Sequence, residues 1–130
     1  MNRLYGLIGF PLGHSFSARY FTEKFQRENL SGYEYRNFPL ESISELPAML
    51  ENHPGLLGFN VTIPYKQEVI PFLTALSAEA REIGAVNCVK ITPQGLYGHN
   101  TDAYGFRKSL LGLIGPMRPD ALILGTGGAS

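Results

Sequence analysis

One lysine and one aspartate are the residues of this sequence best suited to acid–base chemistry. Lys66 closes the stretch GFNVTIPYK, residues 58–66, and Asp102 closes the stretch GHNTD, residues 98–102. A lysine amine can give a proton to an oxygen, or take one, where burial lowers its pKa. A carboxylate beside it would complete an acid–base pair and hold a substrate hydroxyl. The alternative is that Lys66 is a solvated helix lysine, which is the commoner situation for that residue.

Two serines at the start of a predicted helix could bind an anion. Ser15 and Ser17 lie in GFPLGHSFS, residues 9–17, between the first predicted strand and the first predicted helix. Both hydroxyls can donate to one carboxylate, and the free backbone N–H groups and the helix dipole favour an anion at the same place. The alternative is that one serine caps the helix while the other is solvated.

Polar residues also stand at other strand ends, where open α/β sheets bind their ligands. Thr62 ends the third predicted strand, and Lys66 is expected one turn into the helix that follows. Asn87 closes the stretch GAVN, and its amide either hydrogen-bonds a ligand hydroxyl or forms a turn. Asn100 or Thr101 can cap the last helix, and one cap is enough, which leaves the carboxylate of the next residue spare.

Cys88 and the histidines show no pattern of a reactive or metal-binding site. Cys88 alternates into a predicted strand and is interpreted as a packed core thiol rather than a nucleophile. The histidines at positions 14, 53 and 99 have no metal-ligand spacing with carboxylates or with Cys88, so we predict no metal site. A single cysteine excludes an intrachain disulfide, which fits a reducing compartment.

The composition favours a small-molecule site over a nucleic-acid or membrane partner. Hydrophobic residues make up 44% of the 130 residues, which is enough for a packed core. Lys and Arg number 11 and Asp and Glu number 11, so the formal net charge is zero and no long-range field attracts nucleic acid or an anionic membrane. No apolar run reaches the length of a membrane span or of a signal peptide. We therefore predict a cytoplasmic protein.

The order of predicted strands and helices indicates an α/β fold. The predicted strands are residues 3–9, 33–38, 56–62, 86–92, 96–99 and 121–124. The predicted helices are residues 15–29, 43–52, 65–73, 77–83 and 102–113. This alternation predicts a three-layer α/β/α architecture with a mostly parallel sheet, to which a hairpin around residues 93–95 adds one antiparallel strand.

The last residues are typical of the start of a cofactor domain. A strand that ends in Gly-x-Gly-Gly opens dinucleotide-binding units, because the glycines allow a tight turn and a close approach of the backbone to a pyrophosphate. We expect residues 1–118 to form a substrate-binding catalytic domain, and residues 119–130 to be the first strand and glycine turn of a Rossmann-type domain that is truncated here. On that expectation the chain by itself is inactive. The alternative is an ordinary glycine turn after a strand.

Five motifs, taken together, resemble one enzyme family. GFPLGHSFS, GFNVTIPYK, GAVN, HNTDAYG and GTGGAS follow one another as in the substrate-binding domain of shikimate dehydrogenase and the start of its NADP domain. The resemblance implies the reversible, NADP-dependent reduction of 3-dehydroshikimate to shikimate, a step towards chorismate and the aromatic amino acids. Ala18, Thr22 and Cys88 depart from the residues usual in the family, and none of them is a predicted site residue.

The resemblance also implies a role for each matching residue. Lys66 is the acid/base residue, and Asp102 positions both it and the substrate. The substrate carboxylate is bound by Ser15 and Ser17. The ring hydroxyls are bound by Thr62, Asn87 and Asp102. The phosphate loop for NADP would begin with Gly125, Gly127, Gly128, Ala129 and Ser130.

Other functions remain open at this stage. A non-catalytic module that binds shikimate or quinate, such as a sensor, would share these motifs, and a complete nucleotide domain after residue 130 would favour the enzyme instead. An enzyme that also acts on quinate is a further alternative, against which Ser17 argues, because some such relatives have threonine at that position. The preference for NADP over NAD follows from the family alone. The one oligomer that we consider is a homodimer.

Overall fold

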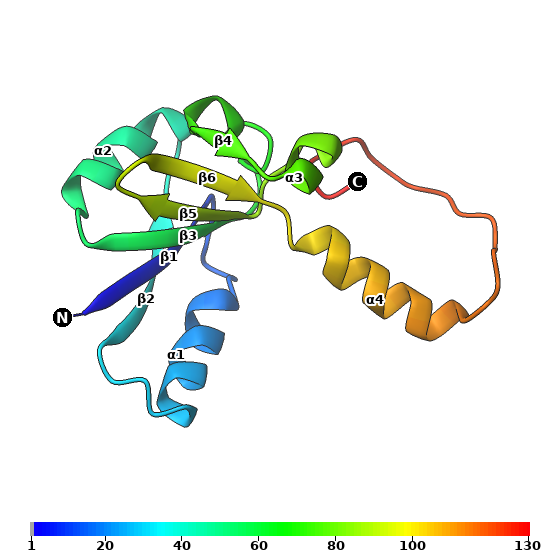
Figure 1. Cartoon of the computed structure of the whole chain (residues 1–130), viewed down its shortest axis with the longest axis horizontal. Helices are drawn as coiled ribbons and strands as arrows, with labels where there is room; N and C mark the ends of the chain where they lie inside the picture. Colours follow the sequence, from blue (N-terminus) through cyan, green and yellow to red (C-terminus); the bar gives the residue numbers. More distant parts are fainter. Residues whose placement is uncertain (1) are drawn as a thin grey trace.

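A six-stranded sheet forms the centre of the molecule (Figure 1). The structure is a computed structural model that describes residues 2–130. Across the sheet the strands lie in the order β2-β1-β3-β5-β6-β4. Their bounds are Arg3–Gly9 for β1, Tyr33–Pro39 for β2, Leu56–Val61 for β3, Ala75–Leu76 for β4, Cys88–Thr92 for β5 and Gly95–His99 for β6.

β5 is the one strand of this sheet that runs against the others. It is antiparallel to both of its neighbours, β3 and β6. The remaining pairs, β1 with β2, β1 with β3 and β4 with β6, are parallel. β5 and β6 form the predicted hairpin, in which Thr92 pairs with Gly95. The prediction of a mostly parallel sheet with one antiparallel strand is therefore confirmed.

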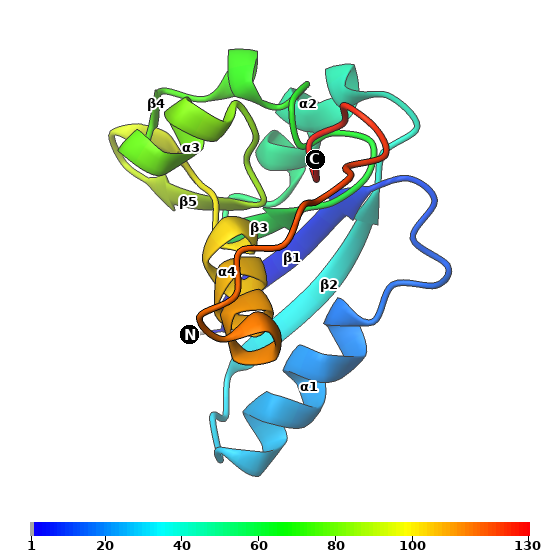
Figure 2. The same cartoon turned by 90° about the vertical axis from the view of Figure 1, so that its right-hand side faces the viewer.

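Helices cover both faces of the sheet and make three layers (Figure 2). One face carries α1, Ser17–Arg27, and the other carries the 3-10 helices η1, Ile43–Glu45, and η2, Ile70–Phe72, together with α2, Leu46–Asn52, and α3, Ala78–Ile83. Successive side chains of β1 point to opposite faces. Leu7 packs with Leu12 and Tyr35 on the α1 side, whereas Ile8 joins Leu46 in the larger core. The predicted α/β/α architecture is confirmed.

α1 packs on the sheet through aromatic side chains. The ring centroids of Phe21 and Tyr35 are 4.6 Å apart and the rings are nearly parallel. Phe25 lies against Tyr5 and Tyr33, with centroid distances of 6.5 and 5.4 Å. Large aromatic side chains contribute much of the packing energy of such a layer, so this cluster holds α1 in place.

Residues 65–73 do not form the helix predicted for them. They form turns and the short η2. A single α-helical hydrogen bond, from residue i+4 to residue i, joins Val69 N–H to Tyr65 O at 2.9 Å, but Pro71 has no N–H to continue the ladder and its ring obstructs the preceding turn. Lys66 therefore lies in a turn rather than in a helix. The chain then enters β4, a strand that the sequence pattern does not predict.

α4 and the C-terminal stretch lie outside the core. α4, Asp102–Ile114, projects away from the end of β6 (Figure 1), and none of its residues is buried. Residues 121–124 do not form the predicted strand; they are irregular, and Leu122 and Leu124 are 83% and 86% exposed. A strand is stable only with neighbours, and no strand among residues 2–130 pairs with this segment. A domain boundary at residue 118 stays a prediction.

No helix within residues 2–130 is both long and apolar enough to cross a bilayer.

Gly58 tests how closely β3 and β5 approach. A Cβ on Gly58 would lie 2.8 Å from the carbonyl oxygen of Val89, which belongs to the backbone and cannot move without shifting β5. Gly58→Ala should lower the free energy of unfolding by about 1–3 kcal/mol, as overpacking does, measured by urea denaturation. Gly55→Ala is the control, because a Cβ there meets no atom within 4 Å. Equal stability of the two variants would contradict the close approach.

Candidate functional site

The predicted site residues gather along one edge of the sheet. β1, β3 and β6 end at this edge, and β5 begins there because it runs the other way. Asn87 lies between its neighbours: its N–H donates to His99 O at 3.1 Å, and its carbonyl accepts the N–H of Val61 at 2.8 Å. The edge consequently carries Ser15 and Ser17 after β1, Thr62 after β3, Asn87 before β5 and Asp102 after β6.

Lys66 and Asp102 form an ion pair at this edge. Lys66 Nζ lies 2.7 Å from Asp102 Oδ2, and the two side chains are 17% and 48% exposed. The Lys66 carbonyl accepts the N–H of Val86 at 2.8 Å, which ties the turn of Lys66 to the residue before Asn87. The interpretation of Lys66 as a solvated helix lysine is therefore wrong. An amine and a carboxylate in this arrangement can hold and transfer a proton at a ligand oxygen.

Asn100 caps α4 and thereby leaves Asp102 free to face Lys66. The Asn100 side chain is buried; its Oδ1 accepts the N–H of Ala103 at 3.0 Å and its Nδ2 donates to Ala85 O at 3.1 Å. The first turn of a helix needs such an acceptor for its free N–H groups. Of the two predicted caps, Asn100 is thus the one that acts.

Asn87 and Thr101 hold the start of β5 to the start of α4. Asn87 Nδ2 donates to the Thr101 hydroxyl, and Asn87 Oδ1 accepts the Thr101 N–H, both at 2.8 Å. Two reciprocal bonds leave the Asn87 amide one orientation. Its second Nδ2 hydrogen and the second lone pair of Oδ1 are the groups that a ligand hydroxyl can use.

Neither Ser15 nor Ser17 caps α1. The N-cap residue is Phe16, with no side-chain hydrogen bond, and Ser17 is the first residue of the helix. The Ser15 N–H instead closes a turn to Leu12 O at 3.0 Å. The capping interpretation is therefore wrong, because the loop brings Phe16 rather than a serine to the cap position. Both serine side chains are half-buried beside the free N–H groups of the helix.

Thr62 lies against the end of β1. Its N–H donates to Ile8 O at 3.0 Å, and the Phe10 N–H donates to Ile63 O at 3.1 Å. A Cβ on Gly9 would meet the Thr62 methyl at 2.5 Å, so only glycine lets the two chain segments come this close. The loop that carries the serines and the end of β3 are thereby held side by side. No hydrogen bond within residues 2–130 joins either serine to Lys66 or Asp102.

The glycine turn at the C-terminal end lies next to Lys66. Gly125 has φ +118°, which suits glycine alone, and the Ser130 N–H closes a turn to Gly127 O at 3.0 Å. A Cβ on Gly128 would lie 2.7 Å from the Lys66 Cβ. Figure 1 shows the chain returning from the far end of α4 so that its C-terminus lies by α3. The predicted phosphate-loop residues therefore stand beside the predicted acid/base residue.

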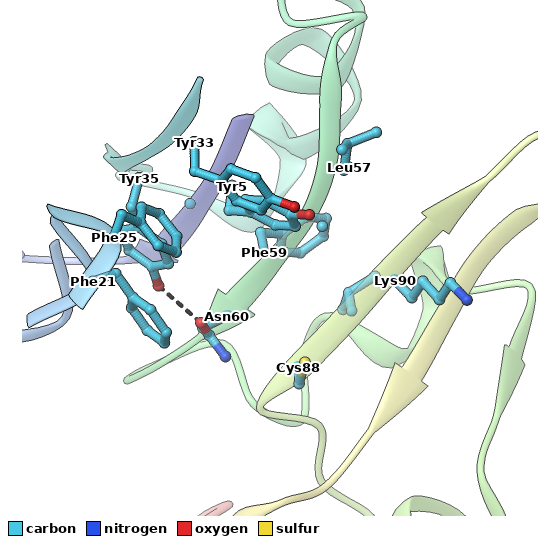
Figure 3. A pocket seen from close by; sticks show the side chains of 13 residues that line it. Tyr5, Phe21, Phe25, Tyr33, Tyr35, Leu57, Phe59, Asn60, Cys88 and Lys90 are labelled. Carbon is cyan, nitrogen blue, oxygen red and sulfur yellow. Dashed lines mark hydrogen bonds between the residues drawn. The ribbon is translucent and has the colours of Figure 1, made fainter. Parts of the chain in front are cut away.

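Tyr35 and Asn60 are polar residues of this region that the sequence analysis missed. The Tyr35 hydroxyl donates to Asn60 Oδ1 at 2.8 Å, at the end of a groove under α1 (Figure 3). The groove has a volume of about 370 Å³ and mainly aromatic and apolar walls. A signal for Asn60 was present, because it stands two residues before Thr62 and thus on the same side of the strand. The sequence pattern around Tyr35 indicated only an aromatic residue of a strand and gave no sign of a role at the site.

Cys88 lines the same groove and is half-buried. Burial raises the pKa of its thiol, so little thiolate is present at neutral pH. This environment fits the interpretation of Cys88 as a packing residue. Among residues 2–130 no three His, Cys, Asp or Glu side chains are grouped so that they could hold a metal ion.

Known proteins that resemble this chain agree on one family. Residues 7–89 match the family described as the shikimate dehydrogenase substrate binding domain. The NADP(+)-dependent shikimate dehydrogenase of Aquifex aeolicus is 42% identical over 131 residues, which cover 98% of this chain and 48% of that enzyme. The chain spans about half the length of the curated relatives it matches.

The solved structures that this chain resembles include several shikimate dehydrogenases and a 5-ketofructose reductase that is 30% identical with a TM-score of 0.77. Shikimate dehydrogenase 1 of Peptoclostridium difficile is 38% identical with a TM-score of 0.85, over 99% of this chain and 49% of that one. Shikimate 5-dehydrogenase of Thermus thermophilus, in complex with NADP(H) and shikimate, is 33% identical with a TM-score of 0.84 over the same shares.

Asn100 offers a test of how the site is supported. Asn100→Ala removes the cap of α4 and leaves the carbonyl of Ala85 without its partner. The free energy of unfolding should fall by about 1–3 kcal/mol, measured by urea denaturation. Asn37→Ala is the matched control, because that side chain is exposed on β2. A loss no larger than that of the control would show that the buried amide contributes nothing.

Proposed function

Because the chain belongs to the shikimate dehydrogenase family, we propose that it forms the substrate-binding half of a two-domain enzyme that interconverts 3-dehydroshikimate and shikimate with NADP. The observation that carries the proposal is the Lys66–Asp102 pair, with 2.7 Å between Nζ and Oδ2, at the edge where four strand ends meet. The pair stands beside the glycine turn, as an enzyme that brings cofactor and substrate together requires.

The proposed chemistry needs one proton and one hydride. The dinucleotide, when bound, supplies the hydride to the carbonyl carbon of 3-dehydroshikimate or removes it from shikimate. As the C–H bond forms, the electrons of the C=O bond move to the oxygen, and Lys66 Nζ, directly or through a water, gives that oxygen a proton. In the reverse direction Lys66 takes the hydroxyl proton as the hydride leaves. Asp102 holds the same hydroxyl and keeps Nζ directed towards it.

The other residues of this edge would bind the substrate and orient it. The carboxylate of the substrate would be held by Ser15 and Ser17 at the N-terminus of α1, whose first turn contains no acidic residue that would repel it. Thr62 and Asn87 would hydrogen-bond the ring hydroxyls, and the Asn87 amide already has a set orientation. A substrate bound at both ends in this way presents one carbon to the cofactor.

The glycine turn fits the phosphate groups of a dinucleotide. The positive φ of Gly125 allows the tight turn, and glycine at position 128 lets the loop pack against Lys66, where a side chain would collide; the backbone N–H groups of such a turn can bind phosphate. Gly127, Ala129 and Ser130 would complete the loop. The choice of NADP over NAD, the preference for shikimate over quinate that Ser17 favours, the cytoplasmic location and the homodimer stay predictions.

Lys66 should act in the chemical step. In the two-domain enzyme, Lys66→Ala should lower kcat by about 10²–10⁴-fold, as loss of a positioned general acid does, while KM for shikimate changes little. Steady-state kinetics with saturating NADP measure both constants. Lys24→Ala, which removes an exposed lysine paired with Glu28 on α1, is the control. If KM alone rises, Lys66 only binds and the proton comes from Asp102 or water. A wild-type protein that binds shikimate without turnover would support the sensor instead.

Ser15 and Ser17 should act in binding. Each hydrogen bond to a charged carboxylate contributes about 1.5–3 kcal/mol, so the double change to alanine should raise KM for shikimate by at least ~100-fold with kcat largely preserved. Ser31→Ala, in an exposed loop, is the control. An unchanged KM in the double variant would refute the carboxylate site.

A further inference from the structure

Tyr35 joins the aromatic layer under α1 to the polar edge of the sheet. The residue is only 7% exposed, and its ring stacks on Phe21. Its hydroxyl leaves this apolar surrounding and donates to Asn60 Oδ1 at 2.8 Å (Figure 3). A buried phenol hydroxyl needs such a partner, since its desolvation is otherwise uncompensated.

The carbonyl of Asn87 sets the orientation of the Asn60 amide, and the hydroxyl of Tyr35 holds the amide in it. Asn60 Nδ2 donates to the carbonyl of Asn87 at 3.2 Å. If the amide were reversed, Oδ1 would face that carbonyl and two acceptors would meet. With Tyr35 donating on one side and Asn87 accepting on the other, only one orientation satisfies both.

The backbone of Asn87 is thereby held from β3 by two donors. Its carbonyl accepts from Asn60 Nδ2 and from the N–H of Val61, the latter at 2.8 Å. The side chain of the same residue forms the reciprocal pair with Thr101. A shift of the Asn60 amide would therefore move the carbonyl of Asn87 and, with it, the amide that faces the ligand.

Ser17 lies near the same hydroxyl. Burial raises the pKa of Tyr35 well above its ordinary value, and the interaction with the Ser17 side chain opposes that rise. The phenol oxygen therefore lies near a serine of the proposed carboxylate site, and it commits its single proton to the amide that supports the proposed hydroxyl site.

We infer that Tyr35 is a positioning residue for substrate binding, which acts through Asn60 on Asn87. The inference rests on the proposed function, because it concerns the residues that would bind shikimate. It assigns Tyr35 a part in affinity and none in proton transfer, since Lys66 lies outside this chain of hydrogen bonds.

Tyr35→Phe in the two-domain enzyme tests the inference, because it removes the hydroxyl and keeps the ring on Phe21. KM for shikimate should rise about 5- to 30-fold, the factor that the loss of one such hydrogen bond produces. kcat and KM for NADP should stay within about twofold of the wild type. Tyr33→Phe is the matched control: it removes a hydroxyl from the same strand, where the partner is Arg3 at the far end from the site.

A double-variant cycle separates positioning from packing. Asn60→Ala should raise KM for shikimate by itself, and adding Tyr35→Phe to it should cause little further rise, because the two residues act in one chain. Independent, multiplying effects on KM would overturn the inference. So would a Tyr35→Phe enzyme that melts at a lower temperature than the wild type yet keeps its KM, since that result describes a packing role only.

The wild-type control separates this inference from the function on which it rests. If the two-domain wild type neither oxidises shikimate nor binds it in a calorimetric titration, the proposed function fails and the inference fails with it. If the wild type is active and Tyr35→Phe behaves like Tyr33→Phe, the inference alone is overturned.

Discussion

The site depends on the reversed direction of β5. β1, β3 and β6 end at the edge where Lys66 and Asp102 pair, and β5 is antiparallel to both of its neighbours. In a sheet without this reversal the residue before β5 would lie at the opposite edge, a strand length of about 17 Å away. The tight turn between Thr92 and Gly95 then returns the chain through β6 to the same edge, so that Asn87 is hydrogen-bonded to the ends of both β3 and β6.

At that edge each polar group has a separate task. Asn100, at 6% exposure, accepts the N–H of Ala103 in the first turn of α4 from inside the protein. Thr101 pairs with Asn87. Asp102 is consequently the one residue of the three whose side chain is available to Lys66. The Lys66 side chain is 17% exposed, and this division of tasks among neighbouring residues is what supplies its carboxylate partner.

The two faces of the sheet support the site differently. The face with α2 and α3 holds the larger aliphatic core, including Ile8, Val69 and Val86, and gives the strand ends a rigid base. The α1 face is aromatic and keeps an open groove, and the hydrogen-bond chain from Tyr35 to Asn87 lies at the end of that groove. Support for the ligand-facing amide of Asn87 therefore comes from a layer whose side chains are mostly apolar.

The sequence by itself determined five of the six strands of the sheet, their mixed directions and the residues of the edge. Strand and helix periodicity report burial, and burial on both faces is local information that β1 or β3 carries in its own residues. The hairpin turn and the glycine turn are likewise local. The pairing of Lys66 with a spare carboxylate from the 100–102 stretch was also predictable, because strand ends of an α/β sheet meet at one edge.

Only the tertiary structure decided how those residues are supported. Residues 65–73 have a helical pattern, but Pro71 and the pairing of β4 with β6 override it. The sequence also allowed Ser15 or Ser17 to cap α1, but the loop places Phe16 at the cap position. Residues 121–124 have a strand pattern but no neighbour among the strands described. The role of Tyr35 depends on Asn60, which is 25 residues away in the chain. Each of these outcomes rests on a partner remote in sequence, and a local pattern does not encode the position of a remote partner.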